Sequence, residues 1–201
     1  MLSVKSSLYV PSVLGIGYKG DGRFNTSING KHTKIYQSWK GMLQRCYSTK
    51  SFKRNPCYVD KKVCEEWHNF QNFAEWMEKN YNPETMQGWH LDKDIIVKGN
   101  RIYSPETCCF VPPEINYLFV RNSGDREYPI GVTYKENAFR ATLNKKDKSY
   151  HIGRFKTPEE AFQAYKIAKE KYIKEIADEW KNVIPPFLYT LLINYKVEIT
   201  D

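Results

Sequence analysis

The chain has 201 residues, a formal net charge of +8 at pH 7, 41% hydrophobic residues and 27% charged residues. This composition predicts a packed core and excludes a wholly disordered chain, and the length suits one large domain or two small ones. No apolar run approaches the roughly 18–20 residues that cross a bilayer, and the first ten residues lack the pattern of a signal peptide. We therefore expect a cytoplasmic protein with no membrane partner.

The five cysteines are an odd number, and Cys108 and Cys109 are adjacent. This arrangement argues against the disulfide framework of a small secreted domain. The sequence also contains no Cys-x-x-Cys pair, so a zinc site is not expected. We interpret the cysteines mostly as small buried hydrophobic residues.

Positive charge is concentrated in two stretches of the chain. Residues 1–60 contain ten Lys and Arg against two Asp, whereas residues 61–124 contain seven basic and nine acidic residues. Residues 126–156 contain eight basic residues against three acidic ones. Together with a 15% share of aromatic residues, this distribution fits a polyanionic partner whose bases can be stacked. A solvated, lysine-rich surface explains the charge equally well.

The first part of the chain contains two predicted helices. Residues 8–19 alternate and contain glycines, which indicates a short strand and a turn. Residues 35–47 have apolar side chains at helical spacing, and residues 48–57 are polar and basic, which indicates a loop. Residues 63–81 carry a stripe of apolar and aromatic side chains with helical periodicity, which we expect to lie in the core.

The middle of the chain predicts a strand–turn–strand–helix unit over residues 89–122, after a turn at 82–88. Its turn lies at Gly99 and Asn100, its second strand passes through Cys109 and Val111, and its helix opens at a Pro-Pro pair. Proline is favoured at the first helical position, because the N–H that it lacks has no partner there. The polar residues 122–129 are the best candidate for a linker.

Three short strands are predicted in the last part, at 130–134, 138–144 and 150–155. Thr157, with Pro158 next and Glu160 three positions on, has the pattern of a capping box that begins a helix reaching about Ala177. A last short helix is expected after the second Pro-Pro pair, at 185–186.

Several blocks between residues 35 and 122 resemble the HNH endonuclease family that is widespread in bacteriophages. In order they are RCY (45–47), VCEEW (63–67) followed by F-x-x-F, LDKD (91–94), GN (99–100) and YSPETCCFVPPEIN (103–116). The resemblance implies an α+β chain whose ββα-metal, HNH-like domain occupies residues 1–124 with an N-terminal extension. It also implies hydrolysis of phosphodiester bonds in DNA with Mg²⁺ or another divalent cation, where a His is the general base and the metal stabilises the leaving oxygen.

Position by position, the resemblance assigns catalytic roles to three residues. His90 matches the general base, Asn100 matches the residue that orients it, and Asn116 falls on the helical position of the motif. Asp92 and Asp94 are the nearby oxygen donors that suit Mg²⁺. Read from residue types alone, His90 fits a surface or hydrogen-bonded histidine equally well, and the two aspartates fit turn-capping carboxylates.

Two positions depart from the family pattern. Trp89 stands where many members carry a metal-binding Asp or a second His, and Thr107 stands where the family supplies an Asn ligand. These positions favour a second hypothesis, in which the chain binds DNA with an inactive centre and acts as a regulator or an inhibitor. A third hypothesis is that the scaffold is reused to bind a protein partner.

Residues 128–175 resemble the plant ethylene-response-factor, or Apetala-type, DNA-binding domain. The resemblance is carried by YPIGVTY (128–134), FRATL (139–143) and YHIGRFKTPEEAFQAY (150–165). It implies a small three-stranded sheet that lies in the major groove of double-stranded DNA and is backed by a helix. We expect this module to form a second domain at 125–201, with a C-terminal tail.

The pattern of the middle strand independently predicts which side chains face the DNA. Alternate side chains of a strand share a face, so Arg140, Thr142 and Asn144 point away from the helix. Arg140 suits bidentate recognition of guanine. The other basic residues are expected to contact phosphates, which fix the position of the protein without reading sequence; they are Lys135, Lys145, Lys146, Lys148 and Arg154. The alternative is a solvated basic sheet face.

Overall fold

The computed structural model describes residues 7–119, 126–146, 148–199 and 201. The chain divides into two compact units, Met1–Pro112 and Pro113–Asp201. Helices and strands are mixed along the sequence and the sheets are small, so the fold is α+β, as the sequence predicts. The domain boundary expected between residues 124 and 125 lies outside the described residues.

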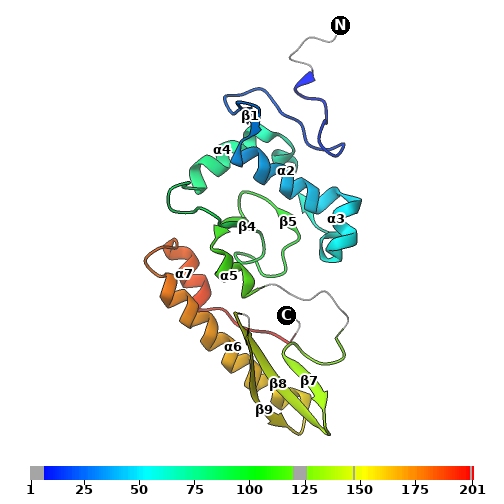
Figure 1. Cartoon of the computed structure of the whole chain (residues 1–201), viewed down its shortest axis with the longest axis vertical. Coiled ribbons are helices and arrows are strands. Elements are labelled where there is room, and N and C mark those ends of the chain that lie inside the picture. Colours follow the sequence, from blue (N-terminus) through cyan, green and yellow to red (C-terminus); the bar gives the residue numbers. More distant parts are fainter. Residues whose placement is uncertain (1–6, 120–125, 147, 200) are drawn as a thin grey trace. The chain divides into compact units, whose positions relative to one another are not determined.

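The first unit contains short helices and very short strands (Figure 1). In chain order its elements are β1 (Ser27–Ile28), β2 (Lys31–His32), α2 (Lys34–Tyr47), α3 (Thr49–Arg54), η1 (Pro56–Tyr58), β3 (Lys62–Val63), η2 (Glu65–His68), α4 (Phe70–Asn80), β4 (His90–Asp92), β5 (Ile102–Tyr103) and β6 (Cys109–Val111). β1 pairs with β2 and β4 with β6, both antiparallel, whereas β3 and β5 pair in parallel. Because these strands are so short, side-chain packing between the helices must carry most of the stability of this unit.

The amphipathic helices α2 and α4 supply that packing. Trp39 of α2, Trp67 of η2 and Phe70 and Phe73 of α4 have no solvent-exposed surface. The Trp39 and Phe70 rings meet edge to face with their centroids 5.5 Å apart. The indole N–H of Trp39 donates to the carbonyl oxygen of Trp67 at 2.7 Å, so this buried polar group is satisfied. The apolar stripes belong to the core, as predicted.

Three local expectations for this unit are wrong. Residues 8–19 contain isolated bridges and turns instead of a regular strand. Residues 48–57 contain α3 and part of η1 instead of a loop, and Pro56 takes the first position of η1, where it loses no hydrogen bond. The stripe at 63–81 is not one helix, because Asn69 caps α4 and the stretch before it forms β3 and η2.

The cysteines are all free, and three of the five are buried. Desolvation raises the pKa of the Cys46 thiol to about 11 and that of the Cys108 thiol to about 12. Cys109 is also buried, whereas Cys57 is exposed. The buried thiols therefore act as small hydrophobic residues, as predicted.

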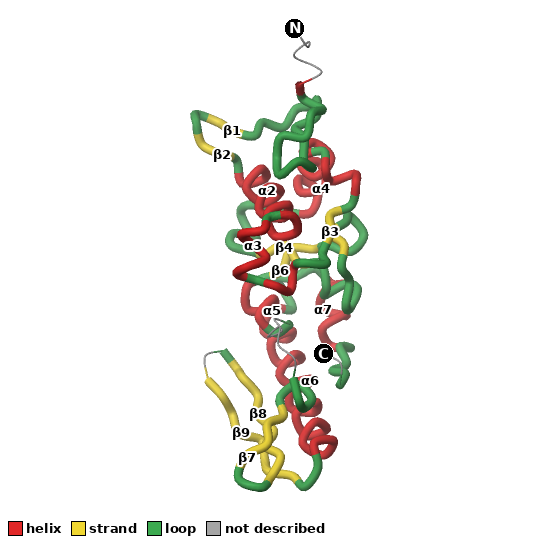
Figure 2. Tube along the Cα trace, turned by 90° about the vertical axis from the view of Figure 1, so that its right-hand side faces the viewer, coloured by secondary structure: helices red, strands yellow, loops and turns green. Residues whose placement is uncertain are grey.

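The second unit is a three-stranded antiparallel sheet packed against one long helix (Figure 2). Its elements are α5 (Pro113–Tyr117), β7 (Val132–Lys135), β8 (Ala138–Lys145), β9 (Lys148–Phe155), α6 (Pro158–Trp180) and α7 (Pro186–Ile193). The sheet order is β7-β8-β9. Figures 1 and 2 both show α6 running along one face of this sheet. The predicted order of this unit is confirmed: three strands are followed by a long helix and then by a short helix at the second Pro-Pro pair.

The apolar face of the sheet packs on α6. Ala141 and Leu143 of β8 are buried, and Phe162 and Tyr165 of α6 are buried as well. Gly131 precedes β7 with φ +76°, and a Cβ there would lie 2.1 Å from the Tyr165 ring. This close approach and the positive φ both require a residue without a side chain.

α6 begins at the predicted capping box. The hydroxyl of Thr157 accepts a hydrogen bond from Glu160 N at 3.2 Å, and the Glu160 carboxylate accepts one from Thr157 N at 3.3 Å. Pro158 occupies the first helical turn. The helix then continues to Trp180, a little beyond the expected end. None of the helices in the described part of the chain, α6 included, is both long and apolar enough to cross a membrane.

Candidate functional site

The polar face of the β7–β9 sheet gathers most of the residues predicted to contact DNA. Directly paired residues of antiparallel strands lie on the same face, and the register pairs Thr133 with Arg140 and Arg140 with Arg154. It also pairs Thr142 with His151 and Asn144 with Ser149. We call the face that points away from α6 the outer face; it consists of Thr133, Lys135, Arg140, Thr142, Asn144, Ser149, His151 and Arg154.

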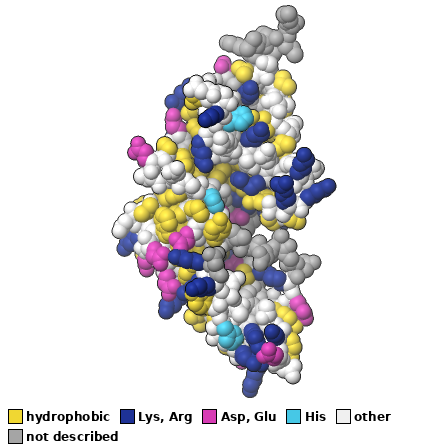
Figure 3. All heavy atoms as spheres, in the orientation of Figure 1, with side chains coloured by type: hydrophobic (Ala, Val, Ile, Leu, Met, Phe, Trp, Pro, Cys, Tyr) yellow, Lys and Arg dark blue, Asp and Glu magenta, His cyan; other side chains and the backbone are white. Residues whose placement is uncertain are grey.

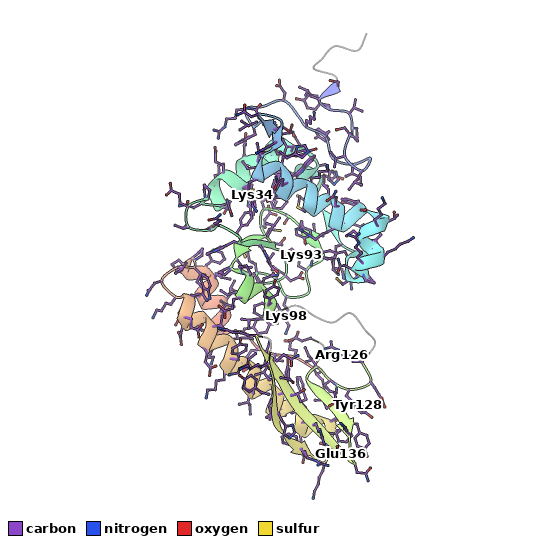
Figure 4. All side chains as sticks on the ribbon, in the orientation of Figure 1. Lys34, Lys93, Lys98, Arg126, Tyr128 and Glu136 are labelled. Carbon is purple, nitrogen blue, oxygen red and sulfur yellow. The ribbon has the colours of Figure 1, made fainter. Side chains whose placement is uncertain are left out.

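Two arginines and one glutamate form the densest charge cluster of the outer face. Glu136, in the turn between β7 and β8, forms ion pairs with Arg140 and with Arg154. Nη2 of Arg154 also donates to the backbone carbonyl of Glu136 at 2.7 Å. Figure 4 places Glu136 at the tip of the sheet, and Figure 3 shows basic and acidic side chains gathered over this end. The two guanidinium groups are thus held together by one carboxylate.

The predicted phosphate contacts divide into two groups. The ammonium of Lys145 lies 3.0 Å from Glu175 of α6 and 4.6 Å from the Tyr172 ring centroid, so Lys145 points toward α6 and not to the outer face. The ammonium of Lys146 lies 3.1 Å from a carboxylate oxygen of Glu114 in α5. Lys135 and Lys148 are exposed and make no ion pair within the described residues, but only Lys135 belongs to the outer face, because Lys148 pairs directly with Lys145.

The predicted strand–turn–strand–helix order is present as β4, β6 and α5, but the segment between β4 and β6 also contains β5, which pairs with β3 and not with either of them. His90 is the first residue of β4, is partly buried and pairs with Val111 of β6. Asn116 lies in α5, which belongs to the second unit, whereas the other candidate catalytic residues lie in the first.

Asp92 ends β4 and caps the turn that follows. Its Oδ1 accepts hydrogen bonds from the backbone N–H groups of Asp94 and Ile95, both at 2.8 Å. Burial raises the pKa of the Asp92 carboxyl above its usual 3.8, although the two amides act in the opposite direction. Oδ2 has no hydrogen-bond partner among the residues that the structure describes.

Asn100 and Lys93 brace the loop after β4. The side-chain amide of Asn100 donates to the carbonyl oxygens of Lys93 at 2.8 Å and Ile102 at 2.6 Å. Lys93, labelled in Figure 4, is only 4% exposed; its ammonium pairs with Asp94 and donates to the Asn100 carbonyl at 3.2 Å. The Thr107 hydroxyl donates to Ile102 O at 2.9 Å. These polar side chains therefore stabilise the loop itself.

The residues present do not complete a metal site. In the described ranges, no three His, Cys, Asp or Glu side chains gather in a group that could hold a metal ion. Asp92 Oδ1 is occupied by two amides and Asp94 by the ammonium of Lys93. Each aspartate therefore has one oxygen engaged within the loop, and no third His, Cys, Asp or Glu of the described residues joins them to hold the Mg²⁺ that the resemblance implies.

A second basic surface lies in the first unit. Residues 22–59 contain no Asp or Glu, and α3 exposes Lys50, Lys53 and Arg54. Figure 3 shows these basic side chains gathered over α3. This surface accounts for part of the N-terminal excess of positive charge.

Sequence analysis missed Glu136 and His151. Glu136 lies in the turn between two predicted strands, four residues before Arg140. The pairing of those strands would have predicted that the two side chains lie close together. His151 shares the outer face because β9 shifts register opposite the Ala141–Thr142 step. That irregularity leaves no signal in the sequence.

Comparison of the chain with protein-family models, with curated proteins and with solved structures found no match. The two resemblances therefore depend on the motifs themselves and on the order of the elements.

Proposed function

We propose that the chain binds duplex DNA through the outer face of the β7–β9 sheet. The observation that carries this proposal is the direct cross-strand pairing of Arg140 and Arg154 on a polar sheet face that α6 leaves uncovered. Arginine forks bind guanine edges and phosphates in a bidentate manner, and the major groove admits a narrow β-sheet. The hydroxyl and amide groups of Thr142 and Asn144 add hydrogen-bonding capacity beside them. The resemblance to the Apetala-type domain supports the same assignment.

The remaining positive charge fits contacts that position the protein without reading sequence. Lys135 and Lys148 are exposed on the sheet, and α3 of the first unit exposes three more basic side chains. Such contacts go to phosphates and supply most of the salt-dependent part of DNA affinity.

Salt dependence tests this proposal. If about six phosphates are neutralised, the slope of log K against log[salt] should be close to −5 for a duplex. Fluorescence anisotropy of a labelled duplex, titrated at several salt concentrations, measures that slope. Binding that is independent of salt, or no binding at all, would exclude the proposal.

A second candidate function is phosphodiester hydrolysis at an HNH-like centre around His90. It is favoured by the order of β4, β6 and α5 along the chain and by the partly buried Asp92 carboxylate, whose Oδ2 has no partner among the described residues. The alternative of an inactive centre is favoured by Trp89, which is buried, and by Thr107, which braces the loop. In that case the chain is a DNA-binding regulator or inhibitor.

A plasmid-nicking assay with Mg²⁺ or Mn²⁺ separates the two alternatives. If the centre is active, His90→Ala should lower the cutting rate by about 10²–10⁴-fold, the usual contribution of a general base. His32→Ala is the matched control, because His32 is an exposed histidine in the β1–β2 hairpin of the same unit. If the wild type does not cut under conditions where it binds DNA, the centre is inactive.

A further inference from the structure

Glu136 occupies an unusual backbone position. It and Asn137 form the two-residue connection between β7 and β8, with φ values of +53° and +56°. Such hairpin turns favour Gly, which has no Cβ to clash in the left-handed conformation, and Asn and Asp, whose short side chains can hydrogen-bond to the nearby backbone. A glutamate there carries a backbone cost, and an outlier of this kind motivates a search for what its side chain does.

The Glu136 side chain pairs with two like charges that the sheet register places opposite each other. Arg140 and Arg154 are direct cross-strand partners, an arrangement that repels unless an anion lies between them. The Glu136 carboxylate forms an ion pair with Arg140 and approaches Arg154 Nη1 to 3.5 Å. An anionic group of a bound ligand would therefore compete with the Glu136 carboxylate for the same two guanidinium groups.

This arrangement is exposed and incompletely satisfied. The side chains of Glu136 and Arg154 are 53% and 48% exposed, so their ion pair is solvated and weak. Nε of Arg140 is buried and has no hydrogen-bond partner among the described residues. The cluster can therefore exchange its carboxylate for another anion without losing a well-packed network.

We propose that Glu136 is an internal counterion that a backbone phosphate of duplex DNA displaces from Arg140 and Arg154. This inference rests on the proposed DNA-binding function and identifies the point of entry of one phosphate. In the free protein, Glu136 holds the two guanidinium groups together and weakens binding to duplexes of any sequence. When DNA binds, the Glu136 carboxylate moves into solvent and the phosphate binds the guanidinium groups of Arg140 and Arg154.

Removing the charge of Glu136 tests the inference. Glu136→Gln should bind a random-sequence duplex about three- to tenfold more tightly than the wild type at low salt, and its log–log salt slope should be steeper by about one. Glu136→Asn removes the same charge with a residue that suits the positive φ, so it keeps the test valid if the glutamine variant folds poorly. Glu159→Gln, an exposed glutamate at the start of α6, makes the same charge change elsewhere in the unit.

The outcomes separate this inference from the proposed function. Tighter binding by both Glu136 variants, with Glu159→Gln close to the wild type, is the expected result. If the wild type binds the duplex with the expected salt dependence and the Glu136 variants bind equally or more weakly, the counterion role is wrong and the DNA-binding function stands. If no variant and no wild type binds the duplex, both fail.

Discussion

Replacing Arg140 and Arg154 together by alanine is expected to weaken duplex binding by about 30-fold or more. A hydrogen bond to a charged group contributes about 1.5–3 kcal/mol, and these two residues are direct cross-strand partners on the outer face. Their removal also leaves Glu136 without its partners on the face that meets the DNA, which adds repulsion from the phosphates. Anisotropy of a labelled duplex at fixed salt measures the change.

The matched control for this variant lies on the opposite side of the same unit. Lys171 and Lys174 are exposed on α6, which covers the other face of the sheet. Lys171→Ala combined with Lys174→Ala makes the same charge change, and we expect its affinity to stay within about threefold of the wild type at moderate salt, where distant charges are screened. An equal loss in both double variants would show that net charge, and not the outer face, determines binding.

Trp39→Ala should lower the free energy of unfolding of the first unit by about 3–5 kcal/mol. The Trp39 side chain is fully buried against Phe70, and its loss would leave a cavity that the short elements of this unit cannot fill. It would also remove the donor to the buried Trp67 carbonyl. Urea unfolding followed by circular dichroism measures the effect.

Gln44→Ala is the control for Trp39→Ala, since Gln44 is exposed on the same helix. We expect it to change stability by no more than about 0.5 kcal/mol. If the two variants unfold at the same urea concentration, α2 does not anchor the core of this unit.

The second unit was the more predictable part because its signals are local. The capping box at Thr157 and Glu160 acts within one helical turn, and the alternation in β8 needs no knowledge of distant residues. The apolar residues of α2 and α4 likewise follow helical periodicity.

Errors arose where a signal was overlooked or where pairing depends on distant residues. Asn29 and Gly30, both at positive φ, make the Asn-Gly turn that joins β1 and β2, a strong hairpin signal that periodicity does not capture. The pairing of β3 with β5 brings together segments about forty residues apart, and two-residue strands have no recognisable pattern. Such pairing cannot be read from the sequence.

The sequence predicted which residues form the candidate sites and on which elements they lie, but not the contacts that their side chains make. The motif placed His90 and Asp92 correctly on one strand. It did not reveal that Asp92 caps a turn, that Asn100 braces the loop, or that Lys93 is buried and takes the Asp94 carboxylate. These contacts depend on how the loop folds back on itself, and they decide which oxygens are open to a ligand.

The salt dependence of duplex binding, compared between the wild type and the two double variants, tests the central claim most directly. If the outer face contacts the DNA, the wild type should give a slope near −5 and the variant without Arg140 and Arg154 a slope shallower by about one, because the two guanidinium groups bind one phosphate. The variant without Lys171 and Lys174 should keep the wild-type slope. Equal slopes in all three proteins would contradict the assignment of DNA binding to this face.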